Sequence, residues 1–221
     1  MASPPAVLCH GCSVVSLTNP SRSPGQSLSK EQALLRLLEG HWRFLNNERS
    51  ARSTTEDERE RLAEGQYPFA AILGCADSRV SPELIFDQGH GDLFVVRVAG
   101  NIVGTGTLAS IEYAIEYLGV RLVVVLGHAK CGAVSAAIET SEGHGAFGFL
   151  VREIAPAVEE ARLLPGVLLE NAVAVNVRRS VELLVSRSDS VARRIESGAV
   201  RIVGAVYSLA TGDVSILHTV G

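Results

Sequence analysis

Apolar residues along this chain form short, nearly continuous runs that alternate with segments of helical periodicity. The runs occupy residues 69–73, 93–98, 122–126 and 200–207, and the helical patterns occupy 107–118, 133–139 and 171–186. Such an alternation is typical of a parallel sheet that helices cover on both faces. We therefore predict an α/β fold with a mainly parallel central sheet of four strands. A short edge strand is expected at 215–218, and the glycine-rich stretch 143–148 is typical of a loop.

The segment before the first strand has a different pattern. Ser29 and Gln32 have the spacing of a helix capping box, and apolar residues then recur at helical spacing, at Leu34, Leu35, Leu38, Trp42 and Leu45. We expect residues 28–64 to form a projecting helical arm whose apolar stripe packs on its own domain or on a partner subunit. Residues 65–221 then form the α/β domain. Residues 1–27, rich in Ser, Pro and Gly, are expected to be disordered.

Composition and charge restrict the partners of the chain. Its 221 residues are 47% hydrophobic, which is enough for a substantial core. Twenty basic and 24 acidic residues give a formal charge of -4, and no dense basic run is present. We therefore expect small molecules or further copies of the chain as partners, and neither nucleic acid nor a membrane. No apolar run approaches the roughly 20 residues of a membrane span.

The number and spacing of the cysteines indicate the cellular compartment of the protein. The chain has four cysteines, Cys9, Cys12, Cys75 and Cys131, which is too sparse a set for a secreted domain held by disulfides. We interpret Cys9 and Cys12 as two thiols of the N-terminal tail, because no second Cys pair lies nearby. A cytoplasmic location is expected. The alternative is an organelle, if the Ser-rich, acid-poor start is a transit peptide.

Reactive side chains follow two of the predicted strands. Cys75, Asp77 and Arg79 stand at alternate positions after the first strand, and alternate residues of an extended chain point to one side. His128 and Cys131 follow the third strand, which a doubly wound sheet places beside the first. Two thiolates and one imidazole form a zinc site that leaves a fourth position for water, as in catalytic sites. The competing interpretation is ordinary burial of small thiols and a polar histidine, and the combination of both clusters disfavours it.

Cys-x-Asp-x-Arg, followed some fifty residues later by His-x-x-Cys-Gly, resembles the signature of the β-class carbonic anhydrases. The segments 86–101 and 110–114 support this resemblance, which covers roughly residues 30–218. It implies that Cys75, His128 and Cys131 hold one Zn²⁺ per subunit and that Asp77 and Arg79 form the catalytic pair. Zinc-bound hydroxide would then hydrate carbon dioxide reversibly to bicarbonate and a proton. With two thiolate ligands, activity is expected to rise from neutral to alkaline pH.

Further positions match the substrate pocket of plant-type members of this class. They are a glutamine nine residues before the first zinc cysteine, a phenylalanine nineteen after it and a tyrosine fifteen before the zinc histidine, here Gln66, Phe94 and Tyr113. The resemblance implies that these three line the pocket, with the rings as a dry wall for an apolar gas. Gly132 is expected to let backbone amides approach the substrate at a helix start. Ile72 stands where the bicarbonate-regulated subtype has a tryptophan, so that regulation is not expected.

The resemblance also implies an oligomeric state, and two alternative functions stay open. The resembling family has a dimer as its basic unit, with active sites at the subunit interface, so we expect a homodimer or a higher homo-oligomer. One alternative function is hydrolysis of carbonyl sulfide or carbon disulfide on the same zinc scaffold. Another is a non-catalytic zinc or redox binding protein, against which Asp77 and Arg79 argue. Arg97 and Glu112 are expected to be buried structural groups that need partners.

Overall fold

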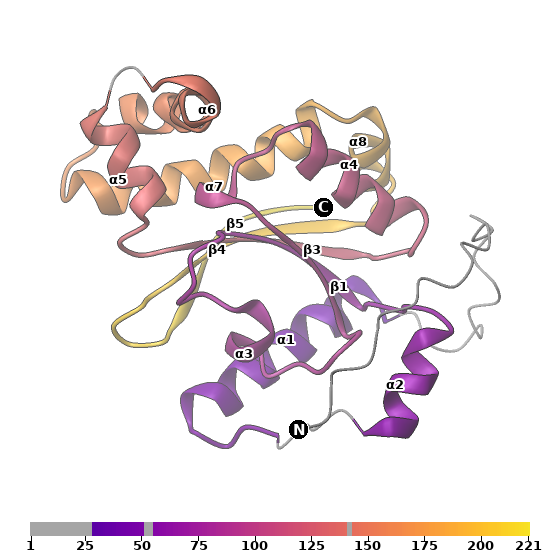
Figure 1. Ribbon diagram of the computed structural model, residues 1–221. Coiled ribbons are helices and arrows are strands. Elements are labelled where there is room, and N and C mark those ends of the chain that lie inside the picture. Colours follow the sequence, from indigo (N-terminus) through magenta and orange to yellow (C-terminus); the bar gives the residue numbers. More distant parts are fainter. Residues whose placement is uncertain (1–27, 51–54, 141–142) are drawn as a thin grey trace, which may run out of the picture.

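A single five-stranded sheet forms the centre of the computed structural model, which describes residues 28–50, 55–140 and 143–221 (Figure 1). Its strand order is β2-β1-β3-β4-β5. The strands are β1 (Ala70–Gly74), β2 (Leu93–Arg97), β3 (Leu122–His128), β4 (Arg201–Tyr207) and β5 (Val214–Val220). The first four are parallel, and β5 pairs with β4 in the antiparallel sense. The predicted α/β fold is confirmed, although the edge strand has seven residues instead of the expected four. The predicted tail at 1–27, with Cys9 and Cys12, lies outside the described residues.

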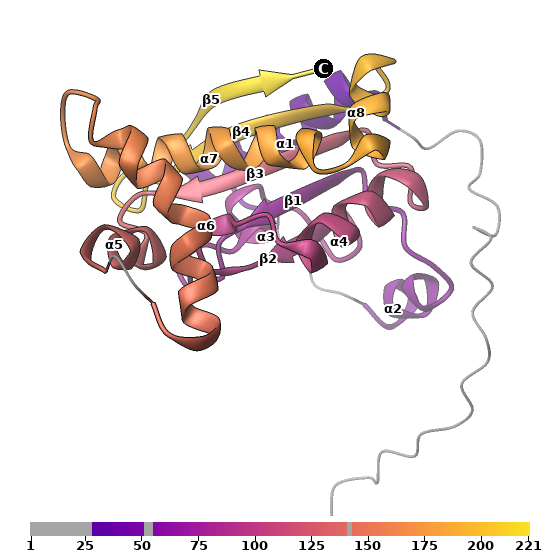
Figure 2. The same cartoon turned by 90° about the horizontal axis from the view of Figure 1, so that it is seen from above.

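Helices cover both faces of the sheet (Figures 1 and 2). On one face lie α4 (Thr105–Glu116), α7 (Leu168–Ser186) and α8 (Asp189–Glu196), and on the other lie α1 (Lys30–Leu45) and the short α3 (Pro82–Ile85). α5 (Gly132–Glu139) and α6 (Gly145–Ala161) pack with α7, and α2 (Glu56–Ala63) buries no residue. Within the described ranges, no helix combines the length and apolarity needed to cross a membrane.

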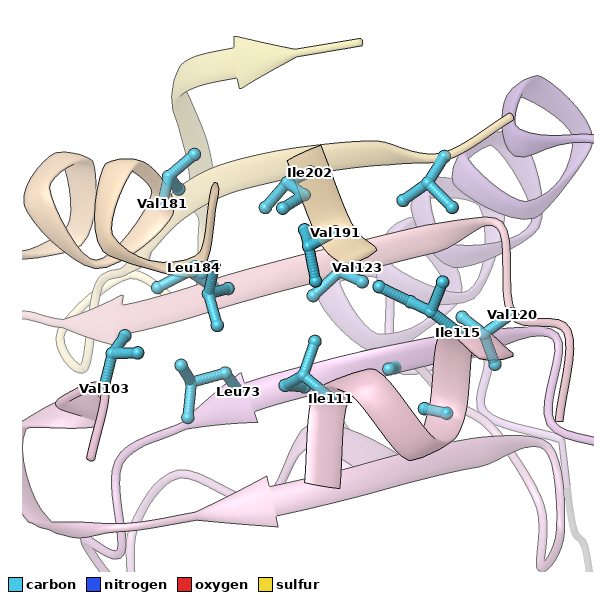
Figure 3. Packing of buried hydrophobic residues seen from close by; sticks show 14 of the residues in the cluster. Leu73, Val103, Ile111, Ile115, Val120, Val123, Val181, Leu184, Val191 and Ile202 are labelled. Atoms are coloured by element: carbon cyan, nitrogen blue, oxygen red, sulfur yellow. The ribbon is translucent and has the colours of Figure 1, made fainter. Parts of the chain in front are cut away.

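Strand side chains alternate between two apolar cores, because successive residues of a strand point to opposite faces. Leu73 and Val123 share a cluster with Ile111 of α4 and Leu184 of α7 (Figure 3). Their neighbours in sequence pack on the opposite face with α1, in a second cluster that includes Ile72. This two-sided burial explains why the strands have nearly continuous apolar sequences.

α1 begins as predicted but does not project from the domain. Ser29 caps the helix, since the backbone N–H of Gln32 donates to Ser29 Oγ at 3.2 Å and Gln32 Oε1 accepts from the backbone N–H of Ser29 at 2.9 Å. Beyond this cap, Ala33 and Leu37 are buried in the sheet core. The expected projection is therefore wrong for α1, and the division of the chain at residue 64 stays a prediction.

The buried face of α1 is not the predicted stripe. It consists of Ala33, Leu37, Gly40 and His41, whereas Leu35, Leu38, Trp42 and Leu45 are exposed. Close approach explains the choice, because a Cβ at Gly40 would lie 1.8 Å from the carbonyl oxygen of Phe86. Small residues thus let α1 pack tightly on α3. Of the predicted stripe, only Leu34 is partly buried against this core, and its other four members face outward.

α6 occupies part of the stretch that was expected to be a loop. The helix begins at Gly145, with His144 as its N-cap residue, and continues to Ala161. Its buried face includes Val151, Ile154 and Val158. Burial of this face supplies the stability that the glycines at its start do not.

Candidate metal centre

The carboxyl ends of β1 and β3 bring the two sequence motifs together. β1 and β3 are neighbours in the sheet, with Gly74 opposite Leu126, so Cys75 and His128 lie at the same edge. Cys131 is the N-cap residue of α5. In the turn between them, Lys130 has a φ of 54°, an unfavourable conformation for a residue with a side chain. This turn returns the chain toward His128, and the predicted proximity of the motifs is confirmed.

Three buried side chains form a compact cluster of possible metal ligands. The ligand atoms of Cys75, His128 and Cys131 all lie within 4.8 Å of one another, and the two sulfurs are 3.9 Å apart. His128 Nδ1 lies 2.9 Å from the carbonyl oxygen of Ala129. Because a carbonyl only accepts, Nδ1 carries the proton and Nε2 keeps a free lone pair. Nε2 is buried and has no hydrogen-bond partner in the described part of the chain, which is the situation of a ligand nitrogen.

The charges of the cluster favour a cation. The hydrogen bond between the two thiols lowers the pKa of Cys75, while the same contact, together with burial, raises the pKa of Cys131. Burial opposes protonation of His128, but the Cys75 thiolate and Asp77 outweigh it and raise the pKa of His128. A divalent cation would remove this competition for protons among Cys75, Cys131 and His128, since it stabilises both thiolates and the neutral imidazole. Two sulfurs and one nitrogen with an open position fit Zn²⁺.

Asp77 lies beside the cluster and is fixed by Arg79. Arg79 Nε donates to Asp77 Oδ1 at 2.9 Å, and Arg79 Nη2 donates to Oδ2 at 2.7 Å. These hydrogen bonds hold the pKa of Asp77 well below its usual range, so the carboxylate is ionised at neutral pH. Asp77 Oδ2 also lies 3.7 Å from His128 Nε2, the nitrogen that could bind a metal.

Arg97 has a role that the sequence did not suggest. It is exposed, not buried as expected, and stands opposite Gly74 at the end of β2. Its Nε donates to the carbonyl oxygen of Cys75 at 3.0 Å and its Nη2 to that of Asp77 at 2.5 Å. Arg97 therefore fixes the loop that carries both residues. The partly buried Glu112 has the partner it was expected to need, because Ser188 Oγ donates to Glu112 Oε1 at 2.5 Å.

The predicted pocket residues do not all reach the cluster within one chain. Gly132 adjoins Cys131, and a Cβ there would meet nothing within 4 Å, so the space beside it is open. Gln66 precedes β1 whereas Cys75 follows it, and a strand of five residues spans about 16 Å. The rings of Phe94 and Tyr113 pack together with their centroids 6.0 Å apart, and Tyr113 is exposed. These placements leave the pocket role of Gln66, Phe94 and Tyr113 a prediction.

Comparisons with known proteins agree with this geometry. Residues 70–214 match the family model described as carbonic anhydrase. The chain is 42% identical over 194 residues to carbonic anhydrase 2 of Mycobacterium tuberculosis, covering 84% of this chain and 91% of that protein. It is 38% identical over 189 residues to a carbonic anhydrase of Mycolicibacterium smegmatis, covering 84% and 92% of the two chains.

Solved structures show the same architecture. The β-carbonic anhydrase CcaA superimposes with a TM-score of 0.68 at 29% identity, covering 83% of this chain and 86% of that one. A β-carbonic anhydrase of Coccomyxa gives a TM-score of 0.65 at 27% identity, covering 84% and 87%. The chain therefore belongs to the carbonic anhydrase family of enzymes, in its β class.

Proposed function

We propose that this enzyme hydrates carbon dioxide reversibly to bicarbonate and a proton, with one Zn²⁺ held by Cys75, His128 and Cys131. The observation that carries the proposal is the buried, unpartnered Nε2 of His128 within 4.8 Å of two thiols. A relative that is 42% identical to this chain is named a carbonic anhydrase, which supports the hydration of carbon dioxide. Zinc bound at such a site supplies a Lewis acid that lowers the pKa of water toward neutrality.

Asp77 is proposed to orient the reacting water. Because Asp77 is ionised, its Oδ2 accepts a hydrogen bond from water beside His128 and so directs a water lone pair toward the substrate carbon. Arg79 contacts both carboxylate oxygens and keeps Asp77 in this orientation. The same contacts compete with a direct approach of Asp77 to the metal position.

A second copy of the chain is proposed to complete the substrate pocket. Gln66 lies at the other end of β1 from Cys75, and the stacked rings of Tyr113 and Tyr117 are both exposed. Trp42 on α1 is exposed as well. Exposed aromatic surfaces are typical of interfaces, and in a two-fold dimer each chain offers the same residues to the other. The homodimer is therefore the proposed functional unit, and a cytoplasmic location stays a prediction.

Stopped-flow hydration of carbon dioxide, before and after removal of zinc with a chelator, tests this function. We expect chelation to abolish activity and added Zn²⁺ to restore it. The activity should rise from about pH 6 to about pH 9, because two thiolates leave less charge on the ion to acidify water than neutral ligands do. A flat profile would contradict the thiolate ligands. Release of sulfide from carbonyl sulfide without hydration of carbon dioxide would overturn the proposed substrate.

A further inference from the structure

The connection after β2 supplies a backbone hydrogen bond to the metal cluster. In the short 3-10 turn η1 (Ala99–Asn101), the backbone N–H of Gly100 donates to Cys75 Sγ at 3.3 Å. Gly100 and Asn101 are both left-handed, with φ of 67° and 45°. A Cβ at Gly100 would also lie 2.7 Å from Ile154 Cδ1. Gly100 adopts this conformation without strain, whereas Asn101 has a side chain and adopts it less readily, so its conformation is favoured where the surroundings hold it.

α7 provides the side chains that hold this turn. Asn176 Nδ2 donates to the carbonyl oxygen of Gly100 at 2.8 Å, and Ser180 Oγ donates to that of Asn101 at 3.1 Å. The two donors are four residues apart and so lie on the same face of the helix. They are 4% and 2% exposed, so water does not compete for these bonds. Each left-handed residue therefore has its carbonyl fixed by one buried donor.

The sheet fixes α7 in turn. Figure 2 shows α7 lying along β3 and β4, and the helix contacts both strands as well as η1. Val177 and Val181, each of which directly follows one of the two donors in the sequence, are buried in the core beneath α7. The hydrogen bonds to η1 thus come from a rigid element and not from a loop.

We propose that Asn176 and Ser180 are positioning residues for the metal centre, which hold the Gly100 amide against Cys75 Sγ. This inference rests on the proposed zinc site. A hydrogen bond to a thiolate stabilises its charge and fixes the direction of the sulfur. Groups that orient metal ligands in this way typically change metal affinity about 10- to 100-fold when they are removed. Asn176 and Ser180 lie outside both ligand motifs, so no sequence spacing pointed to them.

Two substitutions test the proposal on the full-length chain. Asn176→Leu keeps most of the side-chain volume without a donor, and Ser180→Ala removes a single hydroxyl. In competition with a chelator, we expect affinity for Zn²⁺ and Co²⁺ to fall about tenfold in Asn176→Leu and several-fold in Ser180→Ala. The sulfur-to-cobalt charge-transfer band of the Co²⁺ form should shift in both. Ser180→Thr, which restores the hydroxyl, should return both readouts toward those of the unsubstituted chain.

Ser188→Ala is the matched control, because Ser188 is also buried but donates to Glu112 and caps α8. It should lower thermal stability and leave both metal readouts unchanged. The proposal is overturned if Asn176→Leu and Ser180→Ala lose stability as Ser188→Ala does yet bind Co²⁺ with unchanged affinity and spectrum. Failure of the unsubstituted chain to bind Co²⁺ through thiolates would overturn the proposed function too. If Asn176→Leu does not fold, the comparison of Ser180→Ala with Ser180→Thr tests the proposal.

Discussion

Asp77 and His128 are neighbours with different proposed tasks, and single substitutions separate them. Asp77→Asn is expected to retain zinc and lose turnover by at least about 100-fold, because the amide keeps the shape but replaces an acceptor oxygen with a donor group. His128→Ala removes the unpartnered Nε2 and should lose the metal itself. Stopped-flow turnover, measured together with the zinc content of each purified variant, checks both outcomes.

The control for this pair is Asp213→Asn, which makes the same chemical change at an exposed residue between β4 and β5. It should retain both zinc and activity. Full turnover in Asp77→Asn would contradict the role assigned to that carboxylate. Loss of zinc in Asp77→Asn would show that the two tasks are not separable.

Individual residues differ in how far the sequence predicted them. Cys75, His128 and Cys131 were predictable, since the carboxyl ends of adjacent parallel strands meet at one edge. Arg97 was not, because its contacts depend on the register of β2 against Gly74, which the sequence does not show. Gly100 and its amide depend on a left-handed turn and on a helix far along the chain, so only the fold shows their relation to Cys75.

At the scale of elements, α1 shows why an apolar stripe is an uncertain guide to the buried face. The inner face contains Ala33 and Gly40, whose small size allows close packing but adds little hydrophobic signal. The outer face holds four large apolar residues, Leu35, Leu38, Trp42 and Leu45. α6 was missed for a related reason, because its glycines and the internal Pro156 have poor helix propensity although the helix buries an apolar face.

Two leucines of α1 give a matched test of its orientation. Leu37 is 1% exposed and Leu35 is 57% exposed, so the same substitution probes the two faces of one helix. Leu37→Ala should lower the free energy of unfolding by about 2–5 kcal/mol, because it leaves a cavity against the sheet. Leu35→Ala should cost the monomer less than about 0.5 kcal/mol. Urea unfolding of both variants, at protein concentrations where the chains are monomeric, checks the difference, and equal losses would contradict this packing of α1.

Glu116 joins α4 to α8 and makes their packing sensitive to pH. Hydrogen bonds from Arg194 at 2.6 and 3.0 Å and from Ser190 lower the pKa of Glu116 from 4.5 to about 2. A lowered carboxyl pKa contributes stability that is complete above pH 4.5 and is lost as the pH falls toward 2. Because the pair is partly exposed, Glu116→Gln should cost about 1 kcal/mol at neutral pH.

Urea unfolding of Glu116→Gln at several pH values measures this linkage. The difference from the unsubstituted chain should be constant from neutral pH down to about pH 5 and should narrow below it. Glu139→Gln, at an exposed position at the end of α5, serves as the control and should show no such narrowing. A difference that stays constant into acid would mean that the ion pair does not persist in solution.

At the scale of the whole molecule, the predicted site residues lie at opposite ends of the sheet. The carboxyl end of β1 carries the metal cluster, and Gln66 lies before its amino end. Apolar side chains remain exposed on α1, on α4 and directly after α4, at Leu35, Leu38, Trp42, Tyr113 and Tyr117. In the proposed dimer, a second copy would cover part of these surfaces and Gln66 would serve the pocket of its partner, so assembly and catalysis are expected to be coupled.

Dilution tests this coupling. The unsubstituted chain should sediment as a dimer or a larger homo-oligomer, and its specific activity should fall when dilution dissociates it. Trp42→Ser should weaken association at least about tenfold, because aromatic residues buried in an interface dominate its binding energy. The control is Leu163→Ser, at an exposed residue next to α6, which should leave association unchanged. Activity per chain in Trp42→Ser should then recover at high protein concentration, since the substitution leaves the metal cluster intact. A fully active monomer at nanomolar concentration would show that one chain forms the whole pocket and that Gln66 acts elsewhere.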